Sequence, residues 1–257
     1  MMKVALCIMC KDEQKYLREN IAHHVLLGVD TIIVYDNNSK IPIKKMKWFK
    51  ENPHVHVVDW PDKKRLSHIR AFRHCLKHFK QFDWIGFIDT DEFVVIKTKE
   101  NIKQFLGHYK EYGGLGIQWK CFGSSGHKTK QESVIESFTQ ASGTMDDKHV
   151  KCFVQTKYCL GPRGNPHQFS YVKGRPCVNE LGKNIPGPFN QPISRKRIQL
   201  NHYVTRSRED FEEKRKRGGG NTQDNNKLTE AFWDRFNKND KECLAILEMR
   251  KKLLNNK

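Results

Sequence analysis

The segment WIGFIDTDEF, residues 84–93, places carboxylates directly after an apolar run. Asp89, Asp91 and Glu92 fall within four positions, and the five residues before them carry no charge. A continuous apolar run is typical of a strand that is buried on both faces of a sheet. Carboxylates at the end of such a strand are costly to remove from water unless a cation meets them. The segment therefore predicts a cationic partner for these side chains.

Two aspartates separated by one residue, Asp89 and Asp91, suit a hard divalent cation. Mg²⁺ and Mn²⁺ prefer carboxylate oxygens, and two such ligands leave coordination positions for water and for a substrate phosphate. A metal that bridges a diphosphate neutralises charge on a departing nucleotide and acts as a Lewis acid. Alternatively, both aspartates cap the next helix or pair with some of the 47 lysines and arginines. The spacing alone leaves both interpretations open.

The elements that must position these aspartates are predicted by periodicity. Short apolar runs alternate with helical patterns over the first ninety residues, which is typical of βαβ units with a parallel sheet. We expect strands at 4–9, 31–35, 55–59 and 84–93, and helices from about 12 to Gly28, at 44–50 and at 64–79. Parallel strands place their carboxyl ends at one edge of the sheet, where open α/β folds bind ligands. The residues expected at that edge are Lys11, Asp36, Asn37, Asp59, Asp89 and Asp91.

The remainder of the chain is less regular and is rich in glycine turns. It indicates loops around a few strands and not an independent module. Ser207 is the predicted N-cap of a basic helix that ends at the glycines 218–220. A final helical region is expected at about 227–254. Its mixture of lysines and leucines after residue 238 suits either docking on the core, which we expect, or peripheral contact with an anionic membrane.

Composition sets broad limits on function. The formal charge of +18 indicates affinity for polyanions, which include nucleic acid, anionic membranes and phosphorylated small substrates. No apolar stretch approaches the roughly 20 residues that span a bilayer. The eight cysteines are scattered through apolar patterns and do not require disulfides, and Cys7 and Cys10 are expected on opposite faces of a strand, which disfavours a zinc site. We expect a soluble cytoplasmic protein.

Seven motifs together carry a resemblance to a known family. They are GVDTIIVYDNNS, WIGFIDTDEF, FGSSGH, VIESF, PHQFSY, NHYVTRS and KRKRGGG. Their order and spacing resemble those of the family 92 glycosyltransferases and their bacterial and viral relatives, over roughly residues 3–220. The resemblance implies a GT-A fold, an α/β architecture with a mixed, mainly parallel sheet flanked by helices. It further implies one catalytic domain over 1–257, with a nucleotide-sugar-binding half at 1–118, an acceptor half at 119–220 and a C-terminal helical segment at 221–257.

The resemblance also implies roles for individual residues. Asp89 and Asp91 match the metal-binding pair, and His202 resembles the C-terminal histidine that supplies a further metal ligand. An imidazole ligand favours manganese over magnesium. Asp36 matches the position that contacts the base or ribose of the donor. The family commonly shows Lys-Asn-Glu after the first strand, where this chain has Lys11, Asp12 and Glu13.

Further basic residues are candidates for binding the donor. Lys11 lies at the ligand-binding edge, and Arg70, on the helix before the metal strand, is a weaker candidate for the diphosphate. Lys214 and Arg217 precede three glycines, so their segment could fold over the diphosphate and exclude water. A solvated basic helix is the alternative.

An inverting transferase needs a general base to take the proton of the acceptor hydroxyl, and that base is normally a carboxylate. Glu136 in VIESF is the candidate. The alternatives left open are His127, Glu132, Asp146 and Asp147, and Trp119 and His167 are possible acceptor contacts.

The predicted function is metal-dependent transfer of a hexose from a nucleotide-diphosphate sugar, a UDP-hexose, to a hydroxyl of a glycan acceptor with inversion, using Mn²⁺ or Mg²⁺. One alternative is a basic nucleic-acid-binding protein, but nucleic acid is not expected because the basic residues are spread from Lys3 to Lys257. Another is a metal-dependent nuclease or nucleotidyltransferase, which also uses paired aspartates. The oligomeric state, the sugar and the acceptor are left open.

Overall fold

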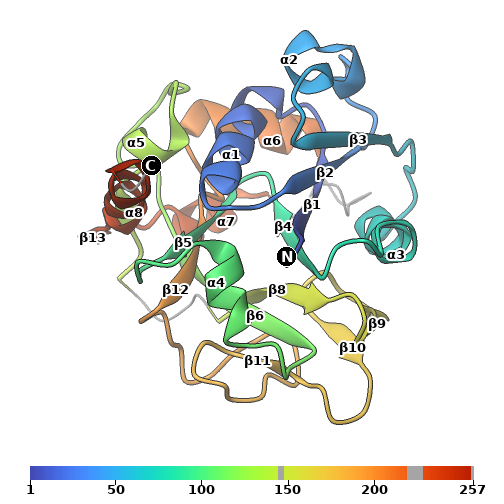
Figure 1. The fold of residues 1–257 in the computed structure, drawn as a ribbon. Helices are drawn as coiled ribbons and strands as arrows, with labels where there is room; N and C mark the ends of the chain where they lie inside the picture. The colour runs from blue at the N-terminus through green and yellow to red at the C-terminus, as the bar shows by residue number, and fades with distance from the viewer. Residues whose placement is uncertain (144–147, 219–227, 256–257) are drawn as a thin grey trace.

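The computed structural model describes residues 1–143, 148–218 and 228–255. Within these residues, nine strands form one sheet with helices packed against both faces (Figure 1). The strand order is β3-β2-β1-β4-β8-β6-β12-β5, and β11 pairs beside β6. The predicted α/β architecture, a mixed and mainly parallel sheet flanked by helices, is confirmed.

The first ninety residues of the chain form four adjacent parallel strands of the sheet. Its elements are β1 (Val4–Cys10), α1 (Gln14–Leu26), β2 (Thr31–Asp36), the 3-10 turn η1 (Ile43–Lys45), α2 (Lys47–Lys50), β3 (Val55–Asp59), α3 (Ser67–His78) and β4 (Trp84–Asp89). Strand β1 pairs in parallel with both β2 and β4, and β2 pairs in parallel with β3. Gly28 follows α1 with a φ of +102°, a conformation that favours glycine and explains why the helix stops there.

Successive side chains of β1 point to opposite faces of the sheet and so belong to two hydrophobic cores. Leu6 and Ile8 belong to the core that includes Leu17 of α1, whereas Cys7 belongs to the core that includes Phe72 of α3. The helices α1 and α3 therefore cover opposite faces of the sheet. Cys10 lies in the first core and Cys7 in the second, so the two side chains point to opposite faces of the sheet, as expected. All eight cysteines are free thiols.

The run 84–93 was predicted as one strand, and this prediction is wrong. Strand β4 ends at Asp89, Thr90 and Asp91 form a turn, and β5 (Glu92–Ile96) pairs antiparallel with β12. The Glu92 carboxylate accepts the Asp89 N–H at 2.8 Å and closes this turn. The break was hidden because the residues of β5 are also buried on both faces, so the apolar pattern continues beyond it. The aspartates consequently lie between two strands.

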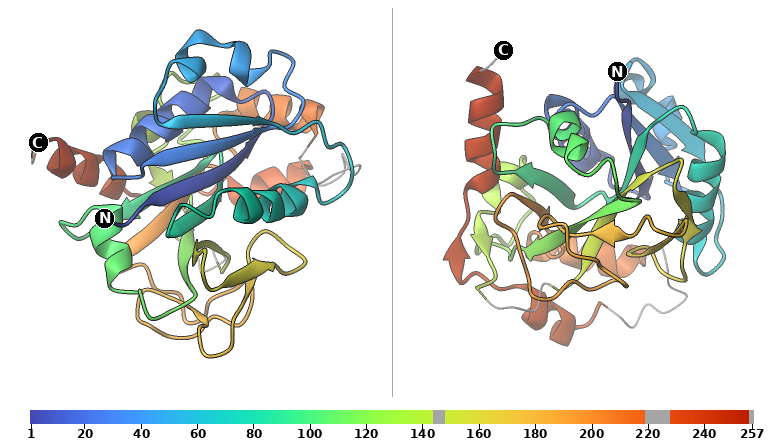
Figure 2. Two further views of the ribbon diagram at one scale, coloured as in Figure 1. Left: turned by 45° about the vertical axis from the view of Figure 1, so that its right-hand side comes forward. Right: turned by 60° about the horizontal axis from the view of Figure 1, so that its bottom comes forward.

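The second half of the chain completes the same sheet. Its elements up to the basic helix are α4 (Ile102–Gly107), β6 (Gly114–Cys121), α5 (Val134–Ser137), β7 (Gln140–Ala141), β8 (Val150–Gln155), β9 (Cys159–Pro162), β10 (Phe169–Tyr171), β11 (Cys177–Val178) and β12 (Ile198–His202). Strand β8 lies antiparallel between β4 and β6, and β12 is parallel to β6 (Figure 2). At one edge, therefore, β1, β2, β3, β4, β6 and β12 end while β5 and β8 begin.

The basic helix α6 (Arg208–Arg217) starts where predicted. The Ser207 side chain accepts the Asp210 N–H, and the Asp210 carboxylate accepts the Ser207 N–H, which makes a capping box. Of the glycines predicted to end this helix, residues 219 and 220 lie outside the described part of the chain.

The final helical region was predicted at about 227–254, and the structure differs from this prediction. Residue 227 itself lies outside the described residues. Instead of one helical segment there are α7 (Glu230–Phe236), β13 (Lys241–Glu242) and α8 (Ala245–Asn255). The interruption arises because β13 pairs antiparallel with β7.

Helix α8 docks on the core. Ile246 and Met249 are 1% and 5% exposed, and the Ile96 N–H of β5 donates to Met249 Sδ at 3.2 Å. The docking expected for this segment is therefore observed. No helix in the described ranges is long and apolar enough to cross a membrane.

We predict that Ile246→Ala destabilises the protein by about 2–4 kcal/mol, since it removes buried apolar atoms and leaves a cavity. The matched control is Leu254→Ala on the same helix, whose side chain is 57% exposed and whose loss should cost less than about 0.5 kcal/mol. Denaturant unfolding of both variants measures the difference. Equal effects would show that α8 does not depend on its buried face.

Candidate active site

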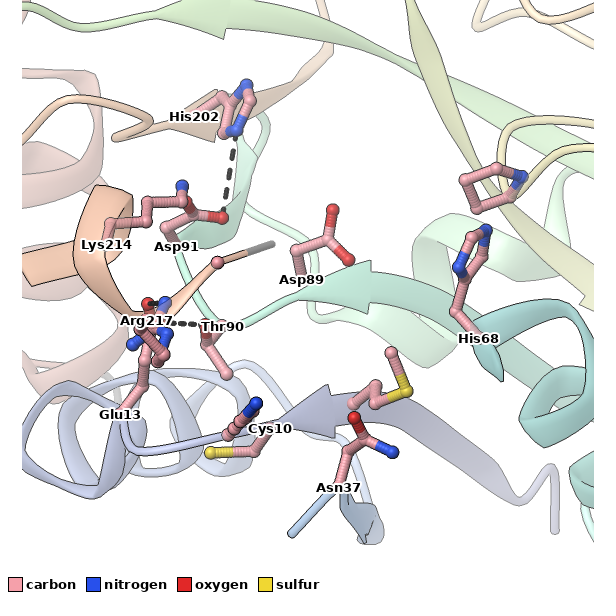
Figure 3. Close-up of a pocket in the computed structure, with 14 residues that line it drawn as sticks. Cys10, Glu13, Asn37, His68, Asp89, Thr90, Asp91, His202, Lys214 and Arg217 are labelled. Carbon is pink, nitrogen blue, oxygen red and sulfur yellow. Dashed lines mark hydrogen bonds and ion pairs between the residues drawn. The ribbon is translucent and has the colours of Figure 1, made fainter. Parts of the chain in front are cut away.

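The carboxyl ends of the parallel strands surround a cavity of about 270 Å³ (Figure 3). Strand ends and the residues just after them contribute one group of side chains, and α6 contributes another. From the strands come Met9, Cys10, Lys11, Asn37, Asp89, Thr90, Asp91 and His202; from α6 and its end come Lys214, Arg217 and Gly218; Glu13, His68 and Pro166 complete the lining. Seven of the residues predicted from sequence, Lys11, Asn37, Asp89, Asp91, His202, Lys214 and Arg217, are thus brought together.

Asp91 lies between a lysine and a histidine. Lys214 Nζ is 2.7 Å from its Oδ2, while His202 Nε2 is 3.7 Å from its Oδ1. Burial raises the pKa of Asp91, but Lys214 together with His202 and Arg206 outweighs burial and holds this pKa at about 2. Asp91 is therefore ionised at neutral pH, and Lys214 supplies the cationic partner that the sequence pattern called for.

His202 sits at the end of β12 opposite Glu92 of β5, and its position is fixed by that strand register. Burial lowers its pKa to about 4, so the imidazole is neutral. Its Nδ1 is buried without a hydrogen-bond partner, and Nε2 faces Asp91 at more than hydrogen-bond distance. Metal–ligand bonds of about 2.1 Å put neighbouring ligand atoms roughly 3–4 Å apart, so Asp91 and His202 fit two ligands of one ion in both spacing and charge. In the described chain, however, no three His, Cys, Asp or Glu side chains gather as a ready metal site.

Asp89 is held by a buried lysine that sequence reasoning missed. Lys151, on β8, has a side chain only 1% exposed, and its Nζ lies 2.7 Å from Asp89 Oδ2 and 3.6 Å from Glu92 Oε2. Burial raises the pKa of Asp89, but the charge and hydrogen bond of Lys151, together with His167 and His202, outweigh burial and keep this pKa well below its usual range. The signal was a single lysine in the otherwise apolar run VKCFV, residues 150–154.

Glu92 is the inner carboxylate beneath these aspartates. Its Oε1 accepts the Trp119 indole N–H at 2.7 Å, and its Oε2 accepts the Asp89 N–H. The Trp119 ring also packs on His202, with ring centroids 4.2 Å apart. Trp119, a predicted acceptor contact, is therefore a buried support of the two strands that carry the site.

Glu13 is a second group that was not predicted to act in the site. Its carboxylate accepts hydrogen bonds from the Thr90 hydroxyl, from Arg206 at 2.9 Å and from Arg217. Although burial raises the pKa of Glu13, the charges of Arg206 and Arg217 lower it to about 2. Glu13 therefore ties the aspartate turn to α6 and to the segment before it. This chain differs from the family's common Lys-Asn-Glu only at Asp12, so the glutamate is retained.

Two predicted donor-binding residues do not line the cavity. The Asp36 carboxylate accepts the N–H groups of Ser39 and Ile43, at 3.1 and 2.8 Å, and so shapes the loop after β2. Its neighbour Asn37 reaches the cavity instead. Arg70 pairs with Asp62 and donates to the carbonyls of two nearby residues, which draws its guanidinium away.

The structure does not bring the candidate base Glu136 to the cavity. Its side chain is exposed on the short helix α5, which packs beside α8 (Figure 1). A base must come within hydrogen-bond reach of the acceptor hydroxyl. This geometry therefore gives Glu136 no support, and its role stays a prediction.

The other candidates for base and acceptor contact have structural partners. Glu132 pairs with Lys15, and His127 contacts the Ser137 carbonyl. His167 donates from Nδ1 to the Val150 carbonyl at 2.9 Å. Asp146 and Asp147 lie outside the described residues.

Comparisons with known proteins give a consistent result at the sequence level. A glycosyltransferase family 92 protein of Oryza sativa subsp. japonica is 30% identical over 143 residues, which are 53% of this chain and 24% of that protein. One from Arabidopsis thaliana is 31% identical over 138 residues, 48% of this chain and 24% of that protein. The aligned part thus spans about a quarter of the length of these relatives.

Among solved structures, similarity is weak. HddC from Yersinia pseudotuberculosis superposes with a TM-score of 0.38 at 12% identity, over 61% of this chain and 78% of that one. The 4-diphosphocytidyl-2C-methyl-D-erythritol synthase of Anaerococcus prevotii gives a TM-score of 0.36 at 11% identity, over 61% and 71%.

The sequence profile of glycosyltransferase family 92 matches residues 2–239, which is nearly the whole chain. With the aspartate turn, the histidine at the end of β12 and the basic helix already assembled around one cavity, this match is decisive: the chain belongs to glycosyltransferase family 92.

Proposed function

We propose that the protein transfers a hexose from a nucleotide-diphosphate sugar, a UDP-hexose, to a hydroxyl of a glycan acceptor in a metal-dependent reaction. The observation that carries this proposal is the cavity itself. It combines ionised aspartates, a neutral buried histidine and cationic side chains from α6 at the carboxyl ends of parallel strands. Family membership supports a sugar donor and an acceptor.

Asp91 and His202 are the residues that would hold a divalent metal, with Asp89 beside them in the same cavity. Imidazole favours Mn²⁺ over Mg²⁺ at such a site. A bound ion supplies charge neutralisation for the leaving diphosphate. His202 is suited to this role because burial keeps its imidazole neutral, and Asp91 because it remains ionised.

The protein's own cations supply the rest of the diphosphate site. Lys11, Lys214 and Arg217 all line the cavity, so their charges face the place where phosphate oxygens would lie. The end of β2 borders the same cavity through Asn37, which suits it to orient the nucleoside part. Asp36 supports this part indirectly, because its carboxylate fixes the loop that presents Asn37.

Inversion with Glu136 as the base remains part of the proposal only as the resemblance implies it. For Glu136 to act, the acceptor would have to extend from the cavity to α5. Asp89 is a carboxylate that already lines the cavity, and its side chain is 50% exposed, but one of its oxygens pairs with Lys151.

We predict that UDP raises the melting temperature only when Mn²⁺ or Mg²⁺ is present, because a ligand that binds only the native state stabilises it by mass action. UDP at about 100 times its Kd would add about 2.7 kcal/mol. Thermal melting with UDP, with and without a chelator, measures this. The same titration on Arg217→Ala and Arg70→Ala separates a cavity residue from one held outside it, and only the first should lose the shift. An equal shift in chelator would contradict the bridging metal.

We predict that Asp91→Asn lowers transfer at least about 100-fold, since it removes a charged ligand of the proposed metal. The matched control is Asp59→Asn at the end of β3, on the same sheet edge but outside the cavity lining, which should keep activity. Activity is measured as release of UDP from UDP-hexose, together with circular dichroism to show that both variants fold. Full activity of a folded Asp91→Asn variant would remove Asp91 from the site.

A further inference from the structure

Lys214 forms an ion pair with Asp91, the aspartate that is proposed to bind the metal. Its Nζ lies 2.7 Å from Asp91 Oδ2 and 3.3 Å from the Val204 carbonyl oxygen, so the charge of Asp91 is already neutralised by the protein. A divalent cation bound to Asp91 would sit within a few ångströms of this ammonium group. Two positive charges at that distance repel strongly in a partly buried site. Lysine and metal therefore compete for one carboxylate.

The two lysines that neutralise the aspartates differ in their freedom to move. The Lys151 side chain is 1% exposed and is fixed between Asp89 and Glu92. The Lys214 side chain is 19% exposed and lines the cavity. A lysine side chain is a flexible stem that carries a compact charge, so Lys214 can swing to another partner in the same cavity. Lys151 is a permanent counter-ion, whereas Lys214 can exchange.

The neighbouring cation of α6 has a different partner. The Arg217 guanidinium is held by Glu13 and donates to the Asp12 carbonyl at 3.3 Å. Glu13 also accepts bonds from Thr90 and Arg206, so it has no role as a metal ligand here. A metal on Asp91 would leave this pair in place. Of these two cations of α6, therefore, only Lys214 competes with the metal for Asp91.

We propose that Lys214 is an exchangeable counter-ion, which neutralises Asp91 in the donor-free enzyme and moves to the diphosphate of the donor when a divalent metal takes Asp91. This inference rests on the proposed function. With this exchange, metal and nucleotide bind cooperatively. The metal replaces Lys214 as the partner of Asp91, and the diphosphate replaces Asp91 as the partner of Lys214. Metal without nucleotide binds weakly, since Lys214 then loses Asp91 and gains no phosphate.

The exchange is tested by titrating Mn²⁺ alone into the full chain and following the electron paramagnetic resonance signal of free Mn²⁺. Lys214→Met, which keeps the length of the stem and removes the charge, should bind Mn²⁺ at least tenfold more tightly than the wild type. The control is Lys216→Met, an exposed lysine on the same helix outside the cavity lining, which should match the wild type. Lys214→Arg keeps the charge and should keep the weak affinity for metal.

In a second titration, UDP is added at saturating Mn²⁺ and followed by calorimetry. Lys214→Met should bind UDP at least tenfold more weakly, because the diphosphate loses its cation. If Lys214→Met binds Mn²⁺ no more tightly than the wild type while the wild type binds UDP only with Mn²⁺, the exchange is refuted and the proposed function stands. If the wild type binds no Mn²⁺ with or without UDP, both are refuted.

Discussion

The structure depends on one electrostatic constraint, which is that three ionised carboxylates, Glu13, Asp89 and Asp91, meet at a single edge of the sheet beside a fourth, Glu92, whose pKa burial raises to about 8. Asp91, Glu92 and Glu13 are at most 7% exposed, and Asp89 lies among them in the cavity. Unpaired charges in such a place are prohibitively costly, and removing one partner of a buried pair leaves the other uncompensated. The chain meets this constraint with cations from distant parts of its sequence: Lys151, Arg206, Lys214 and Arg217. The charges of the site are consequently neutralised only when both halves of the chain pack together.

Much of the fold could be predicted because local patterns determine it. Strands β1 to β4 follow from apolar runs, and the Ser207 cap and Gly28 stop follow from residue types with well-defined local effects. Once parallel strands are recognised, the grouping of their carboxyl ends follows from geometry alone. That is why the sequence alone predicts Lys11, Asp89 and Asp91 at one edge of the sheet, where they line the cavity.

The remainder could not be predicted because it depends on long-range pairing. Periodicity does not show that β8 enters the sheet between β4 and β6, and only that insertion brings Lys151 under Asp89. The turn at Thr90 was hidden for the same reason, since β5 is as apolar as β4 and differs only in its partner, β12. Arg70 was predicted at the donor from its position along the chain and Asp36 from the family resemblance, whereas both side chains bind close neighbours in the sequence.

The pairing of each early carboxylate with a late cation has a consequence for synthesis on the ribosome. Glu13, Asp89 and Asp91 emerge first, but Lys151, Arg206, Lys214 and Arg217 follow only much later. Before β8 and α6 have been made, a nascent chain that had already folded its first four strands would lack the strand that pairs with β4 and the cations Lys151 and Lys214 that neutralise the edge. The carboxylates of the first half are therefore neutralised only after the second half of the chain has been made and has folded against them.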